Sequence, residues 1–134
     1  MKTSHAVLIL GAAILWSSHA RAADSDSKAV YAQARDTAAA TYKSARKQCD
    51  AITGNPKDLC IAEAKAARVH ADEEAGAVYK NTLKAYTQAR MRIASANYDR
   101  DRVRCAAVTG NSRDVCLEQA KAVLVTAQAD AKAD

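Results

Sequence analysis

Small and aromatic apolar residues recur at steps of three and four along the chain from Lys28 onwards, which places them on one face of a helix. Up to Thr53, that face carries Tyr31, Ala34, Ala38, Tyr42, Ala45, Cys49 and Ile52. Charged residues such as Arg35, Lys43 and Lys47 occupy the opposite face. The pattern predicts an amphipathic helix that ends near Thr53.

Two more stripes of the same kind follow. One consists of Cys60, Ala64, Ala67, Ala71, Ala75 and Val78, and the other of Cys116, Ala120, Val123 and Ala127. The last helix is expected from Ser112 to about Ala131. Antiparallel pairing of such stripes predicts narrow hairpins whose helices meet through alanine.

The segment that joins the first two stripes occurs twice. Cys49–Cys60 and Cys105–Cys116 are identical at seven of twelve positions, at an offset of 56. Each copy has a glycine suited to the left-handed end of a helix, an asparagine that can cap the next helix, and an aspartate near its positive end. These turn and cap residues are Gly54, Asn55 and Asp58 in the first copy and Gly110, Asn111 and Asp114 in the second.

Each turn has one cysteine on either side, a little over one helical turn away. The two side chains can therefore face each other, and neighbouring alanines permit the close approach that a disulfide needs. We expect the pairs Cys49–Cys60 and Cys105–Cys116, although four cysteines allow three pairings and could also stay reduced and buried.

The central segment from Pro56 to Thr109 leaves two arrangements open. Its only weak points are Gly76 and the pair Asn81–Thr82, and glycine alone does not end a helix. The favoured arrangement is an all-α fold in which two disulfide-stapled hairpins share one long or kinked central helix, about 80 Å long if straight. The alternative is a bend near Gly76–Thr82, which would fold the hairpins into a compact four-helix bundle.

Residues 1–22 are typical of a secretory signal peptide. Lys2 precedes an apolar run that is too short to span a membrane, and Ala20-Arg21-Ala22 forms a small-x-small cleavage site. A retained N-terminal anchor helix is the alternative. We expect a periplasmic or secreted protein with no membrane span after cleavage, a first hairpin repeat over 23–83 and a second over 84–134. Export would place the cysteines where disulfides persist.

Composition predicts a thin core. Of the 112 residues after position 22, 28 are alanine and none is phenylalanine. Alanine favours helices but buries little apolar area, so two disulfides worth roughly 3 kcal/mol each would matter for stability. Loss of the signal segment lowers the net charge from +5 to +3, too little to indicate a nucleic-acid partner.

The repeated unit Tyr-x6-Cys-x4-Gly-Asn-x2-Asp-x-Cys-x3-Ala-Lys, over roughly 42–66 and 98–122, resembles a group of small exported Cys-x10-Cys repeat proteins of Gram-negative bacteria. Most are uncharacterised, and some carry a TolA-like, cell-envelope biogenesis label. The resemblance implies a periplasmic or secreted helical protein and brings no catalytic residue.

The chain offers little material for catalysis. His70 is the one histidine after the signal segment, and His70 with Glu74 would need further ligands to hold a metal. A Cys-x10-Cys pair lacks the Cys-x2-Cys spacing of thiol oxidoreductases. The sequence therefore indicates no catalytic site, no metal and no cofactor.

One cluster of charge is distinctive. It consists of Arg90, Arg92, Arg100, Arg102, Arg104 and Arg113, diluted by Asp99 and Asp101. It is either a site for an anionic polymer or lipid, or a solvated helix surface with internal ion pairs. Two functions follow: a non-enzymatic interaction or structural module of the cell envelope, whose partner would be an envelope protein, or a binder of anionic polymer or lipid through the second repeat. The oligomeric state stays open.

Overall fold

The computed structural model describes residues 19–133, and in this range the chain consists of helices and turns without a strand. The helices are α1 (His19–Gln48), α2 (Gly54–Lys80), α3 (Leu83–Cys105) and α4 (Gly110–Ala133), with a short 3-10 turn, η1 (Cys49–Ala51), after α1. The all-α class and the two disulfide-stapled hairpins are confirmed. Of the predicted signal segment, residues 1–18 lie outside the described part, and the remainder begins α1.

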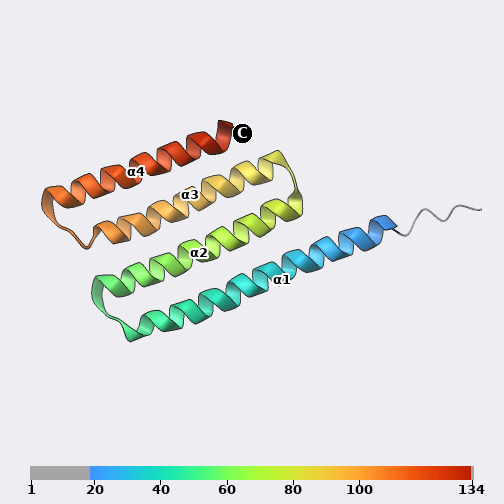
Figure 1. Cartoon of the computed structure of the whole chain (residues 1–134), viewed down its shortest axis with the longest axis horizontal. Coiled ribbons are helices and arrows are strands. Elements are labelled where there is room, and N and C mark those ends of the chain that lie inside the picture. Colours follow the sequence, from blue (N-terminus) through green and yellow to red (C-terminus); the bar gives the residue numbers. More distant parts are fainter. Residues whose placement is uncertain (1–18, 134) are drawn as a thin grey trace, which may run out of the picture.

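The four helices lie side by side, and each runs in the opposite direction to the one before it (Figure 1). Within the described chain, contacts join α1 to α2, α2 to α3 and α3 to α4, and no pair further apart in sequence. The fold is therefore a single layer of helices with two open faces and two edges, formed by α1 and α4.

The favoured long or kinked central helix is wrong, because the chain reverses between Lys80 and Leu83, within the bend near Gly76–Thr82 that was the alternative. Asn81 adopts the left-handed conformation (φ 45°, ψ 48°), and its N–H donates to the Ala77 carbonyl at 2.8 Å. The Thr82 hydroxyl then caps α3 by accepting from the backbone N–H of Ala85 at 3.1 Å. Asparagine tolerates this conformation and threonine is a good cap, so two residues suffice to end one helix and begin the next.

The turns inside the hairpins differ in detail from the expectation. Gly54 and Gly110 have positive φ angles of 67° and 58°. However, α1 ends at Gln48, six residues before Gly54, and extended backbone at Ile52 and Thr53 leads into α2. The left-handed glycine thus opens the second helix instead of closing the first.

The asparagines are not the caps that the sequence suggested. The Asn55 side-chain amide donates to the Val103 carbonyl oxygen at 3.2 Å, so it joins α2 to the end of α3. Asn111 makes no side-chain hydrogen bond within residues 19–133. Asp58 and Asp114 lie just beyond the first turn of their helices, where the attraction to the helix end has weakened.

The core consists of alanine and cystine. Its buried residues are Ala38, Cys49, Ala64, Ala66, Ala77, Ala85, Ala89, Ala94, Cys105, Ala120 and Ala131. Among the described residues, the largest fully buried side chains are Cys49 and Cys105. Because alanine buries so little area, each seam between helices contributes little hydrophobic free energy.

Both expected disulfides are present. They join Cys49 to Cys60 and Cys105 to Cys116, with Cα–Cα distances of 5.7 and 5.6 Å. Helix axes usually pack about 8–10 Å apart, so each disulfide draws its two helices together at the turn end of the hairpin.

Candidate functional site

A groove of about 800 Å³ runs between α1 and α2, and we call it the α1–α2 groove. Alanine is the commonest residue of its lining, which also includes Val30, Thr37, Thr41 and Val78, and its only charged residues are Arg68 and Glu74. Near the open end of the hairpin, the rings of Tyr31 and Tyr79 stack with centroids 4.7 Å apart. The disulfide closes the helices at the opposite end.

A second groove, of about 920 Å³, lies between α2 and α3 and reaches the start of α4; we call it the α2–α3 groove. Its apolar lining includes Ile61, Ala62, Ala66, Val69, Ala96, Val103, Ala106 and Leu117. Along α2, Lys65 and Val69 of this groove lie about half a turn from Ala67 and Val78 of the α1–α2 groove. On α1, Arg35 reaches Asp72 on the side of α2 that carries Val69, whereas Val30, Thr37 and Thr41 lie on the other side of α1. The two grooves therefore open mainly on opposite faces of the layer, although Tyr42 and Arg68 line both.

Charges of both signs surround the α2–α3 groove. Lys65, Arg113, Asp58 and Asp99 line it, and none of them has a hydrogen bond or ion pair within residues 19–133. Arg102 also lines it, and its guanidinium lies 5.7 Å from the centre of the Tyr98 ring. The groove thus combines an apolar lining with three cations and two carboxylates that have no ionic partner in this chain.

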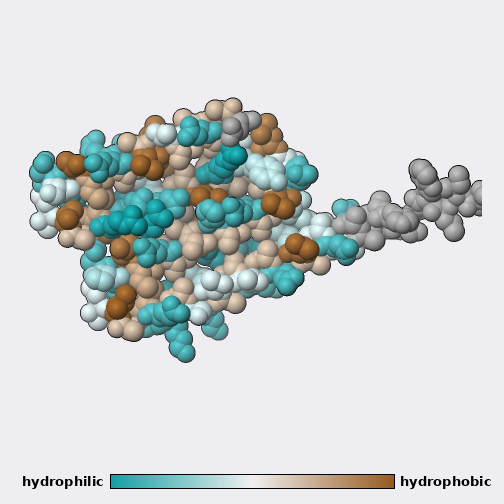
Figure 2. All heavy atoms as spheres, in the orientation of Figure 1, coloured by the Kyte–Doolittle hydropathy of each residue, from teal (hydrophilic) through white to brown (hydrophobic). Residues whose placement is uncertain are grey.

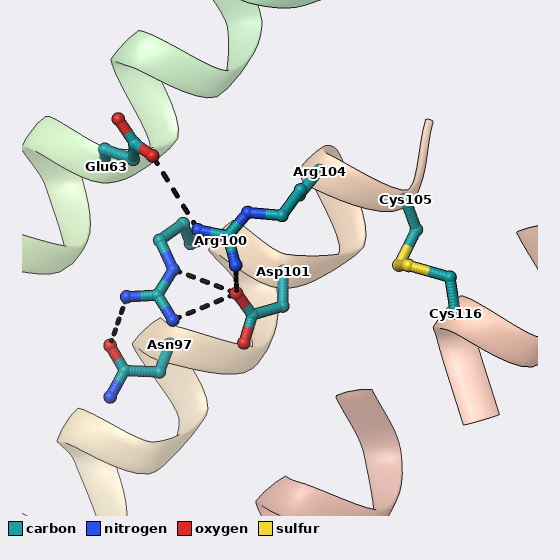
Figure 3. A network of polar contacts seen from close by, with 7 residues as sticks. All are labelled: Glu63, Asn97, Arg100, Asp101, Arg104, Cys105 and Cys116. Atoms are coloured by element: carbon teal, nitrogen blue, oxygen red, sulfur yellow. Dashed lines mark hydrogen bonds and ion pairs between the residues drawn. A yellow bond between two sulfur atoms is a disulfide. The ribbon is translucent and has the colours of Figure 1, made fainter. Parts of the chain in front are cut away.

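Other arginines of the second repeat are held by internal contacts (Figure 3). The Asp101 oxygen Oδ1 accepts from Arg100 at 3.0 Å and from Arg104 at 2.9 Å. Arg100 also donates to the Asn97 amide oxygen at 3.2 Å, and Arg104 reaches Glu63 of α2 at 3.7 Å. One carboxylate therefore orders two arginines beside the Cys105–Cys116 disulfide.

The structure divides the predicted arginine cluster. Arg92 pairs with Glu73 of α2 at 3.0 Å, and Arg100 and Arg104 belong to the Asp101 network. Arg100, Arg102 and Arg113 line the α2–α3 groove, whereas Arg90, Arg92 and Arg104 do not. The six arginines are thus not one site, and only Arg102 and Arg113 combine a place in the groove with the lack of an acidic partner.

Polar contacts join the two hairpins across α2 and α3. They are Arg92–Glu73, Arg104–Glu63 and the hydrogen bond from Asn55 to the Val103 carbonyl. Each ion pair is at least partly exposed, so each stabilises the seam by about 1 kcal/mol or less. Their value is mainly positional, because they fix how one hairpin lies against the other.

Sequence reasoning missed one further polar residue, Asp72. Its Oδ2 accepts from Arg68 Nε at 2.6 Å, and its Oδ1 lies 3.8 Å from Arg35 Nε of α1. That second oxygen is buried and has no hydrogen-bond partner. The Arg68–Asp72 spacing of four residues was the signal that could have revealed the pair.

The described residues contain no group of three or more histidine, cysteine or acidic side chains placed to hold a metal ion. His70 lies 3.3 Å from Glu74, and both side chains are more than half exposed. No helix in this part of the chain is long and apolar enough to cross a membrane.

Comparisons with protein families, curated proteins and solved structures find no match. The features of this chain that bear on function are therefore its grooves, the charges around them and the disulfides.

Proposed function

We propose that this chain is a non-enzymatic helical module of the cell envelope, periplasmic or secreted, that acts by presenting a surface to another protein. The observation that carries the proposal is where apolar residues lie. Alanine and cystine fill the interior, while larger apolar side chains lie outside, among them Val30, Val78 and Leu83, each about two-thirds exposed. Figure 2 shows such side chains as separate patches over the visible face.

The disulfides indicate an oxidising, extracytoplasmic environment. The apolar run and cleavage motif within residues 1–22 support export through a signal peptide. In an oxidising compartment the disulfides can stabilise a fold whose core is too thin to be stable by packing alone.

The α1–α2 groove is the surface best suited to a partner protein. Two antiparallel helices form a seat for a third, and the alanine lining leaves room for large side chains from that third helix. Since Arg68 and Glu74 are the only charges in the lining, the partner segment should be an apolar helix face with few charges.

The test uses a purified bait in a cell-envelope extract, with Val30→Glu and Val78→Glu placed in the groove. Val125→Glu is the matched control, because Val125 is 58% exposed and lines neither groove. We expect the two groove variants to lose a captured protein that the wild type and the control retain, with unchanged thermal unfolding. A captured protein that all three variants retain equally would contradict use of this groove.

A second candidate function is binding of an anionic polymer or lipid. It is favoured by Lys65, Arg102 and Arg113, which lie around one groove without a carboxylate partner. Co-sedimentation with vesicles rich in anionic lipid would test it. Binding by this mechanism should fall steeply as salt rises and should weaken in the double variant Arg102→Ala/Arg113→Ala.

A further inference from the structure

We infer that a second copy of this chain covers the α2–α3 groove, which produces a two-fold symmetric dimer with two layers of helices. This inference goes beyond the proposed function and concerns the opposite face of the molecule.

The first reason to expect a second copy is that the helices of this chain form a single layer. Stable domains bury the apolar face of one layer against a second layer, and the described chain supplies one layer only. The lining of the α2–α3 groove nevertheless contains the half-buried Ile61, Val69 and Leu117, which are larger than any fully buried residue of the core. A second layer over this groove would give these side chains the buried surroundings that the monomer lacks.

The second reason is that the charges around the α2–α3 groove favour a second copy over an anionic ligand. The lining also contains Arg68 and Arg100, which are already paired with Asp72 and Asp101. An anionic headgroup would be attracted to Lys65, Arg102 and Arg113 but repelled by Asp58 and Asp99 in the same lining. In a two-fold dimer across the groove, the carboxylates of each copy can instead pair with the cations of the other. Self-complementarity of this kind is what an interface between identical surfaces requires.

The third reason is that the face around the groove is about as large as a stable protein interface requires. The 23 residues of α3 extend about 35 Å, and α2, α3 and the start of α4 together span a width of about 20 Å. Treated as a flat face, the surface that one copy can bury is therefore about 700 Å², close to the roughly 800 Å² per partner of a stable interface. The α1–α2 groove lies on the other face and would remain open in the dimer.

The experiment measures the mass of the disulfide-intact chain by sedimentation equilibrium over a range of concentrations. We expect a dimer at micromolar concentration for the wild type. Arg102→Glu places a carboxylate at an exposed position of the groove and should weaken association about tenfold or more, because it sets like charges against each other. Val69→Lys should abolish the dimer by placing a charge in its apolar lining.

Val30→Lys on the opposite face is the matched control and should remain dimeric. Circular dichroism checks the fold of each variant, and Arg102→Glu keeps the test decisive if Val69→Lys fails to fold. Hydrogen–deuterium exchange should also show protection that rises with concentration at 61–69 and 96–103, but not at 30–41.

Three results would overturn the inference. One is a wild type that stays monomeric at about 100 μM, far above the dissociation constants of stable interfaces of this size. Another is a dimer that Arg102→Glu and Val69→Lys leave intact, because the contact would then lie elsewhere. The third is a monomer whose groove binds anionic vesicles, since that would identify a lipid headgroup as the occupant.

Discussion

The two hairpins have the same disulfide and turn, but the side chains along the contact between their helices differ. Each has a disulfide across its turn and a glycine with positive φ at the start of its second helix. At the repeat offset of 56, however, Ala45 of the first hairpin corresponds to Asp101 of the second, which orders Arg100 and Arg104. Arg68, which binds Asp72, corresponds to the half-buried Leu124.

This difference separates what the fold needs from what it tolerates. Turn, disulfide and alanine stripe are common to both hairpins, so they define the architecture. Charged and aromatic residues beside the seams vary, because helices held together by a disulfide at one end do not depend on one particular set of side-chain contacts. The varying positions are therefore where the two halves of the molecule can acquire different partners.

Loss of a disulfide should have the largest effect. Cys49→Ala/Cys60→Ala and Cys105→Ala/Cys116→Ala each open a loop of the same length, so each should lower the free energy of unfolding by about 3 kcal/mol. Chemical denaturation followed by circular dichroism measures both. If removal of one disulfide lowers the free energy of unfolding far less than removal of the other, the two disulfides are not equivalent. The difference would then come from the side-chain contacts between the helices of each hairpin.

The turn glycines should come next. Gly54→Val and Gly110→Val force a β-branched residue to positive φ, at a cost of about 1–2 kcal/mol. An added Cβ would have space at both positions, since the nearest atom is Pro56 Cδ at 3.9 Å from the Cβ of residue 54 and nothing lies within 4 Å at residue 110. The cost should therefore be similar in both hairpins. Ala51→Val is the control, and an equal loss of melting temperature there would show that backbone strain is not the cause.

The link between the hairpins supplies a third test. Thr82→Ala removes the hydroxyl that caps α3 and should cost about 1 kcal/mol. Thr53 precedes α2 at the same kind of position but makes no capping hydrogen bond, so Thr53→Ala should cost only a few tenths of a kcal/mol. Thermal unfolding of the two variants gives the comparison, and a smaller loss for Thr82→Ala would contradict the capping role.

The smallest expected change is a gain. Gly76 lies inside α2, and a Cβ added there would meet no atom within 4 Å. Gly76→Ala should therefore raise the free energy of unfolding by about 0.5–1 kcal/mol through lower entropy of the unfolded chain. A loss of stability measured by denaturation would mean that the helix needs flexibility at this point.

Much of the fold could be predicted from local chemistry. Periodic alanine gave the helices, and cysteines placed symmetrically about a glycine gave the disulfides. The reversal at Asn81 was predicted only as the alternative arrangement, because a left-handed asparagine and a threonine cap compete with continued helix by about 1 kcal/mol each way. Packing of α2 on α3 favours the turn over a continued helix, and this packing cannot be seen from a short stretch of sequence.

The candidate surfaces were less predictable for a related reason. Lys65, Asp99 and Arg113 come from three different helices, so only the folded layer brings them around one groove. The arginine cluster looked uniform in sequence because nothing there shows which carboxylate each arginine reaches. Arg92 and Arg104 find theirs on α2, 19 and 41 residues away in the chain.

The succession of neighbouring contacts has a consequence for how the chain folds. Since every helix of the described chain touches only the next one in sequence, the contacts close short loops and should form within microseconds to milliseconds. Oxidation of the cysteines takes seconds to hours and would then set the pace of maturation. Each hairpin also contains both of its own cysteines, so the first can close its disulfide before the second has folded.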